Sequence, residues 1–141
     1  MKRIIILSIL FSVLFYGCNQ PKYSNYFSFD NQIWFQDSSI VFDFNSDNST
    51  KLNFEINLSY DNNYPFQNLY TTYSLIDSEK NVVNSNMIEL QLFEKKYGYP
   101  LGSGVFNSFI IDTTFLKNQN ILKNEDYKLL IKHSMRSESL K

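Results

Sequence analysis

The residue with the clearest chemical role is Cys18, the only cysteine of the chain. It follows Gly17 at the end of an apolar run over residues 4–16, and Lys2 and Arg3 precede that run. A short basic segment, an apolar segment and a small residue before the cleavage point make a secretory signal peptide, and this run is shorter than the roughly 20 apolar residues of a membrane-spanning helix. Lipoprotein signal peptidase cuts between a small residue and a cysteine, so we expect a diacylglycerol on the Cys18 thiol.

Two alternatives to lipidation stay open, because Phe15 stands where the usual recognition sequence has Leu. The segment could be an ordinary cleaved signal followed by an incidental cysteine, or an uncleaved anchor. A single cysteine permits no intramolecular disulfide, so packing must stabilise the fold. It also excludes zinc sites built from cysteine pairs, and acylation would leave no cysteine nucleophile.

The other residues that could do chemistry have simpler explanations. His133, the only histidine, continues an alternating strand pattern and lacks the serine and acid of a catalytic triad. Residues 43–47 resemble the first half of an EF-hand loop, but Asn48 replaces the turn glycine and Phe54 replaces the bidentate glutamate. A solvated turn is the favoured interpretation there, with a loosely bound calcium ion as the alternative. We expect no enzymatic activity, no cofactor and no metal site.

The elements that must position any surface site are strands. Residues 52–60 alternate apolar and polar side chains over five repeats, which predicts a strand with one buried face and one wet face. Further strands are expected at residues 40–44, 69–76, 88–92, 105–115 and 127–133, and a helical turn is considered for 116–125. Turn-forming clusters separate these runs. The fold class is therefore predicted as all-β, a single antiparallel β-sandwich or jelly-roll-like domain. The boundaries are 1–17 signal peptide, 18–25 lipidated tether and 26–141 sandwich domain.

Composition limits the classes of partner. Once Lys2 and Arg3 are removed with the signal peptide, the chain has 11 basic and 14 acidic residues, and no basic stretch indicates a nucleic-acid partner. The aromatic residues, 13 Phe, 10 Tyr and Trp34, provide ample material for a core. The tyrosines at 60, 64, 70, 97 and 99 could stack on sugars if they shared an exposed face, although core and cross-strand packing explains most of them more simply.

Several segments together resemble the gliding-motility lipoprotein GldH family of Bacteroidetes. They are the lipidation cysteine followed by Trp34 and the strand 40–44, then Tyr64-Pro65-Phe66-Gln67-Asn68-Leu69, Gly98-Tyr99-Pro100-Leu101-Gly102-Ser103-Gly104, and Tyr127 through Met135-Arg136 with Leu140. The chain departs from the family pattern after Gly104 and before Tyr127, and it ends at Lys141 where family members continue through a final strand. If that strand is central, its loss is expected to expose a sheet edge.

The resemblance implies a role in gliding motility and in the linked type IX secretion machinery. Such a protein would face the periplasm from a lipid anchor, act as an assembly or stability factor, and bind other machinery proteins rather than a small-molecule substrate. Aromatic and arginine side chains dominate interface energetics. The candidate contact residues are therefore Trp34, Tyr64, Phe66, Tyr99 and Arg136, with a core position for Trp34 equally open. The alternative function is a surface glycan-binding lipoprotein of a polysaccharide-uptake system.

Overall fold

The computed structural model describes residues 21–141 and confirms the all-β class. One short 3-10 helix, η1 (Asp30–Gln32), precedes the strands. The strands are β1 (Trp34–Phe35), β2 (Ile40–Asn45), β3 (Thr50–Asp61), β4 (Asn68–Ile76), β5 (Val82–Gln91), β6 (Ser103–Val105), β7 (Ser108–Ile121), β8 (Asp126–His133) and β9 (Ser139–Leu140). The strands expected at residues 40–44, 52–60, 69–76, 88–92 and 127–133 are present as β2, β3, β4, β5 and β8. The single strand expected at 105–115 is wrong at its start, because the chain turns back at residues 106–107 and β6 pairs with β7.

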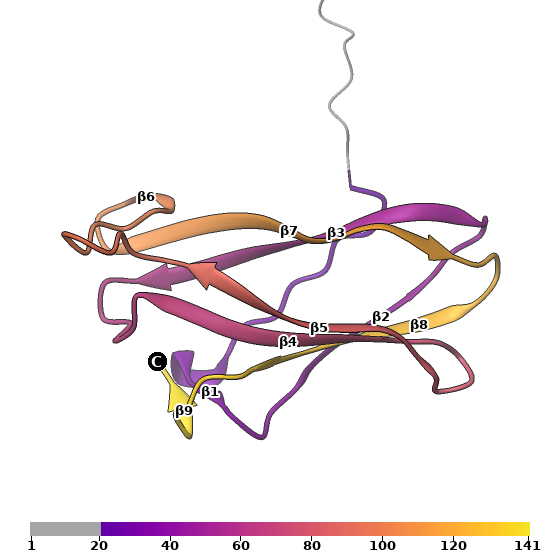
Figure 1. The fold of residues 1–141 in the computed structure, drawn as a ribbon, viewed down its shortest axis with the longest axis horizontal. Coiled ribbons are helices and arrows are strands. Elements are labelled where there is room, and N and C mark those ends of the chain that lie inside the picture. The colour runs from indigo at the N-terminus through magenta and orange to yellow at the C-terminus, as the bar shows by residue number, and fades with distance from the viewer. Residues whose placement is uncertain (1–20) are drawn as a thin grey trace, which may run out of the picture.

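The strands form an antiparallel sandwich, as predicted. A four-stranded sheet has the order β2-β8-β4-β5, and a three-stranded sheet has the order β3-β7-β6. The two sheets lie one above the other in Figure 1, and a small third sheet, β1 with β9, lies at one end. All strand pairs are antiparallel, so the connections are short turns and loops.

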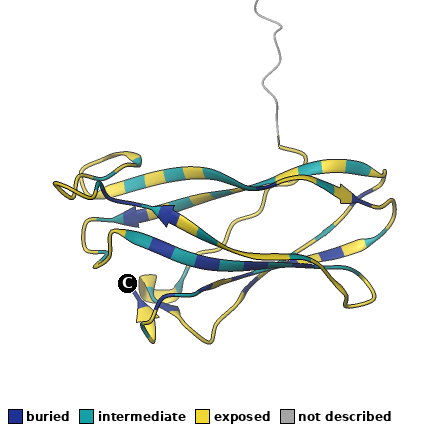
Figure 2. Cartoon of the chain, in the orientation of Figure 1, coloured by how far each residue is buried: buried dark blue, intermediate teal, exposed yellow. Residues whose placement is uncertain are grey.

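Burial alternates along the long strands with the period that the sequence indicated (Figure 2). On β3 the inward residues are Leu52, Phe54, Ile56, Leu58 and Tyr60, while Glu55 and its polar neighbours face solvent. On β4 every second residue is buried, from Leu69 to Leu75. Alternate side chains of a strand point to opposite faces, and each sheet therefore offers one apolar face to the other.

The helical turn considered for residues 116–125 is wrong, because β7 continues to Ile121. The strand pattern is irregular here because Asn118 has φ +54°, a conformation that asparagine tolerates better than most residues. The Asn118 backbone N–H donates to Oδ1 of Asn53 at 2.9 Å, and the β3–β7 register shifts on both sides of Phe54. This bulge breaks the period of two, which hid the end of the strand in the sequence.

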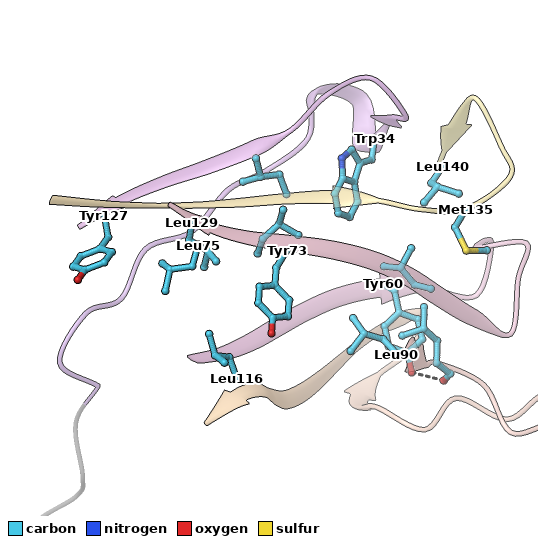
Figure 3. Close-up of a cluster of buried hydrophobic side chains, with 14 of the residues drawn as sticks. Trp34, Tyr60, Tyr73, Leu75, Leu90, Leu116, Tyr127, Leu129, Met135 and Leu140 are labelled. Atoms are coloured by element: carbon cyan, nitrogen blue, oxygen red, sulfur yellow. Dashed lines mark hydrogen bonds between the residues drawn. The ribbon is translucent and has the colours of Figure 1, made fainter. Parts of the chain in front are cut away.

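The core lies between the two large sheets (Figure 3). Leu75, Leu90 and Ile121 are almost completely buried. Aromatic rings bridge the sheets: Tyr73 on β4 lies 4.8 Å from Phe115 on β7, measured between ring centroids. Such pairs contribute beyond the area that they bury.

Tyr60 ties the end of β3 to the loop that follows β5. Its hydroxyl donates to the carbonyl of Leu92 at 2.7 Å (dashed in Figure 3) and accepts the backbone N–H of Gly102 at 2.8 Å. A side chain at Gly102 would collide with the carbonyl of Ile110 and with the Tyr60 hydroxyl. One buried phenol therefore fixes both ends of residues 92–102.

Replacing Tyr60 by Phe is expected to destabilise the domain by about 1–3 kcal/mol, because it leaves the Gly102 N–H without its partner and removes one of the two hydrogen bonds to the Leu92 carbonyl. Urea unfolding measures the change. Tyr97→Phe is the matched control, because Tyr97 is exposed and should shift stability by no more than about 0.5 kcal/mol. Equal effects of the two substitutions would contradict this role for Tyr60.

Candidate functional site

Two of the predicted contact residues, Phe66 and Arg136, line the same surface pocket. The pocket has a volume of about 490 Å³, and its other lining residues are Tyr70, Met87, Ser134 and Met135. Phe66 lies in the loop between β3 and β4, while Tyr70 and Met87 lie on β4 and β5. Segments distant in the sequence therefore meet at this point, which we call the Phe66–Arg136 pocket.

The segment after β8 is held rigidly in the wall of this pocket. The backbone N–H of Ser134 donates to the carbonyl of Tyr70 at 2.7 Å, and the hydroxyls of Ser134 and Thr72 lie 2.6 Å apart. The Tyr70 N–H in turn points to the sulfur of Met135 at 3.3 Å. These bonds fix Arg136, the next residue, at the rim.

The chemistry of the pocket suits a protein contact. Phe66 and Met87 are exposed apolar side chains, and Arg136 is exposed beside them. Among residues 21–141 the ion pair present joins Lys128 to Asp43, so Arg136 has no carboxylate partner within the described chain. An apolar patch bordered by one arginine can bind an apolar side chain next to a carboxylate, since arginine binds carboxylates with two parallel hydrogen bonds.

Tyr64 supports this pocket from behind. Its ring meets Phe66 edge-on at 5.7 Å, and its hydroxyl donates to the carbonyl of Asn68 at 3.1 Å. Burial raises the pKa of Tyr64, so the hydroxyl stays a neutral donor. Tyr64 therefore holds Phe66 in position rather than offering its own face to a partner.

The remaining two candidates lie elsewhere. Trp34 is only 5% exposed: it stacks on Phe29 at 4.8 Å, and its Nε1–H donates to the carbonyl of Ser38 at 3.1 Å. Its burial places it in the core, the position that the sequence left open, and the expected surface contact does not fit this structure. Tyr99 is exposed beside Tyr97, at a ring separation of 6.1 Å, and does not line the pocket.

The five tyrosines considered for sugar stacking do not share one exposed face. Tyr60 is buried, Tyr64 and Tyr70 are half-buried, and Tyr97 and Tyr99 are exposed on a separate loop. Most of them serve packing, as the simpler interpretation held.

His133 lies in the core and has no catalytic partner near it. It is 1% exposed, its ring meets Trp34 edge-on at 5.4 Å, and neither ring nitrogen makes a hydrogen bond. Thr71, the residue opposite it on β4, also has a buried hydroxyl without a partner. Burial lowers the pKa of His133; the nearby backbone of Trp34 opposes this shift but does not reach hydrogen-bond geometry.

Potential metal ligands are dispersed over the domain. Within residues 21–141, no group of three or more His, Cys, Asp or Glu side chains converges on a common point. The loop that resembles half an EF-hand uses its oxygens internally: Asp43 pairs with Lys128 at 2.9 Å, and the Ser46 hydroxyl donates to the carbonyl of Asn48 at 2.6 Å. This arrangement fits a structured turn.

Comparison with known proteins decides the family. Residues 22–141 match the model of the GldH lipoprotein family. This chain belongs to that family. A relative, the gliding motility lipoprotein GldH of Flavobacterium johnsoniae, is 27% identical over 135 residues, which cover 91% of this chain and 79% of the relative. No solved structure matches the chain.

Membership in the GldH family confirms the resemblance read from the sequence and makes this chain a lipoprotein of the gliding-motility type, with a lipid anchor to a membrane. No helix within residues 21–141 has the length and apolar character needed to span a membrane. Cys18, the expected lipidation site, lies outside the described residues, and its acylation stays a prediction.

Sequence reasoning missed the contribution of Met87 to the pocket. A signal was present, because Met87 is an apolar residue on the polar face of β5, whose other face carries the half-buried Ile88 and the buried Leu90. An apolar side chain at a position where the period-two pattern predicts a polar, solvent-facing residue indicates a candidate contact surface. The meeting of Phe66 with Arg136 had no such signal, because it depends on β4 pairing with β8.

The burial of His133 predicts a loss of stability in acid. Its pKa is lower in the folded protein than the ordinary value of about 6.5, so the unfolded chain binds the proton first as the pH falls. The free energy of unfolding should therefore be constant for this group above about pH 6.5 and should decrease as the pH falls from there toward the folded-state pKa. Urea unfolding between pH 8 and pH 5 measures it.

His133→Leu is the matched variant, because leucine fills a similar volume in the apolar core and does not titrate. The slope of stability against pH between 7 and 5 should become smaller in this variant. An unchanged slope would contradict the assignment to His133.

Proposed function

We propose that this protein is a non-enzymatic, lipid-anchored component of the gliding and type IX secretion machinery, in which it acts as an assembly or stability factor. In this proposal Cys18 carries the lipid, the domain faces the periplasm, and the Phe66–Arg136 pocket binds another protein of the machinery.

The observation that supports the proposal best is the extent of the family match. It begins at residue 22, only four residues after the lipidation motif Gly17-Cys18, and continues to residue 141. The whole folded domain is therefore of the GldH type and begins directly after the expected anchor. Two or more acyl chains give durable attachment to a membrane, whereas a single chain holds only marginally.

A non-enzymatic role is supported by how the described polar residues are used. The single histidine is buried against Trp34 without a hydrogen bond. The pocket contains no acid or base, and its one charged group is an arginine, which stays protonated at all physiological pH values. Binding is the activity that such a surface favours.

Deletion of the gene is expected to abolish both colony spreading and type IX secretion. The measurement is the spreading of colonies on agar together with mass spectrometry of the secreted proteome. The full 141-residue chain should restore both, whereas Cys18→Ala should mislocalise and restore neither. Normal spreading and secretion in the deletion strain would refute the proposal. Glycan binding, the alternative, would then be tested with the folded domain on a glycan array.

The pocket is tested by Arg136→Glu and Phe66→Asp, each introduced into the chromosomal gene. Both side chains are exposed, so each substitution should change stability by only about 0.5 kcal/mol. Loss of a central contact typically weakens binding by about 2 kcal/mol or more, which is roughly 30-fold. We expect reduced spreading at unchanged protein abundance.

Lys123→Glu is the matched control for charge reversal. Lys123 is exposed in the turn between β7 and β8, at the other end of the sandwich from the segment after β8 (Figure 1). Its substitution should leave spreading unchanged. Equal spreading of the pocket variants and the wild type would remove the pocket from the proposed contact surface.

A further inference from the structure

The largest concentration of exposed apolar side chains lies outside the Phe66–Arg136 pocket. Residues 97–110 include no Asp, Glu, Lys or Arg. They present six exposed large apolar side chains: Tyr97, Tyr99, Leu101, Val105, Phe106 and Ile110. We call residues 97–110 the apolar tip. A concentration of exposed apolar side chains of this kind indicates a contact with a partner or with lipid.

Phe106 is the most prominent residue of the apolar tip. It is 96% exposed at the turn between β6 and β7, where Val105 pairs with Ser108. Its φ is +57°, in the left-handed region that is unfavourable for a bulky L-residue. Phe106 therefore buries almost nothing and strains the backbone. A strained residue of this kind is a reason to look for a function of the side chain.

The apolar tip is a rigid projection. A side chain at Gly104 would overlap the backbone of Ser108, so glycine alone permits the close pairing of β6 with β7. The preceding loop is fixed by the Leu101 N–H, which donates to the carbonyl of Leu92 at 2.9 Å, and by the Gly102 N–H bonded to Tyr60. The exposed side chains are thus held outward by a defined backbone.

Lysines flank the apolar tip on one side. Lys95 and Lys96 directly precede it, and the Lys96 ammonium lies 4.7 Å from the centre of the Tyr97 ring. Tyrosines with lysines at the margin of an apolar surface are the residues that favour the interface between lipid headgroups and acyl chains. Lysine also attracts anionic headgroups.

The expected anchor holds a bilayer close to the domain. Cys18 is three residues before Pro21, a span of at most about 11 Å. The following residues are attached to the sandwich: Lys22 Nζ donates to the Ser46 hydroxyl at 3.4 Å, and the Tyr23 ring lies 5.5 Å from that of Phe44. These contacts lie at the β2–β3 end of the sandwich, whereas the apolar tip lies at the Tyr60 end of β3. The described chain begins on the side of the β3-β7-β6 layer, and β6 lies on the same side in Figure 1, so one bilayer that runs along this layer can reach both.

We propose that the apolar tip inserts into the bilayer that holds the lipid on Cys18, and so gives the domain a second, protein-made membrane contact that fixes its orientation. This inference rests on the lipid anchor of the proposed function. A projecting hairpin matches a fluid bilayer, which needs no complementary surface, better than a protein interface, which needs a well-packed patch of about 800 Å² on each side.

The test uses the full lipidated protein reconstituted into vesicles of phosphatidylethanolamine and phosphatidylglycerol. Acylation consumes the Cys18 thiol, so Phe106→Cys provides a single site for an environment-sensitive fluorophore. Glu79→Cys is the matched control, because Glu79 is exposed in the turn between β4 and β5 at the opposite end of the sandwich (Figure 1). Lipids brominated in the acyl chains should quench the label at 106 and leave the label at 79 unchanged.

Flotation of the same vesicles distinguishes the lipid anchor of the proposed function from the membrane insertion of the apolar tip. If the protein floats but the label at 106 is not quenched, the lipid anchor is supported and insertion of the apolar tip is refuted. The apolar tip would then be a contact surface for a protein partner. Equal quenching at both positions would also refute insertion of the tip. Failure to float would refute the anchor and the inference together.

Phe106→Asp and Phe106→Asn provide a second test without a label. Asparagine tolerates positive φ, so Phe106→Asn should melt at the same temperature as the wild type or higher. Limited proteolysis of the vesicle-bound protein reports orientation: the hairpin should be protected in the wild type and cleaved in both variants. Identical cleavage of the wild type and the variants would contradict the proposal.

Discussion

The packing of side chains between two sheets is the constraint on which the whole domain depends. Within the described residues no backbone ladder joins the four-stranded sheet to the three-stranded sheet, and one side-chain bond crosses between their strands, from Asn84 Nδ2 to Gln119 Oε1 at 3.1 Å. The cohesion between them comes from bridging pairs such as Tyr73 with Phe115 and Phe44 with Phe54. Because the only cysteine precedes the domain, no disulfide can support this interface. Aromatic rings fill a gap of about 10 Å between sheets with few side chains.

This apolar packing between the sheets explains where the polar and reactive groups lie. The buried face is so apolar that His133 and Thr71, which lie opposite each other on β8 and β4, find no hydrogen-bond partner. A histidine held in this way is poorly suited to proton transfer, because its charged form is disfavoured by burial. The core therefore serves stability, and the surfaces available for function are the edges, the loops and the segment after β8.

Two such surfaces differ in shape. The Phe66–Arg136 pocket is concave and bordered by a cation, and it forms where the segment after β8 is bonded to β4 and lies near Met87 of β5. The apolar tip is convex and uncharged, and the Tyr60 hydroxyl links its base to β3. In the proposed function the pocket binds a protein partner and the lipid holds the membrane, and in the further inference the tip adds a second membrane contact. A rigid sandwich can then transmit a fixed orientation from one surface to the other.

The sequence by itself determined the class of fold, the inward faces of β3, β4 and β8, and the family, because period-two burial and ordered motifs are local properties. It also identified residue types suited to contact, of which Phe66 and Arg136 lie in one pocket. Only the tertiary structure decided that Trp34 is core, since its burial depends on Phe29 and on the pairing of β1 with β9. The continuation of β7 to Ile121 and the exposure of Phe106 were decided there too. Both depend on residues with positive φ, which a pattern of apolar and polar letters does not record.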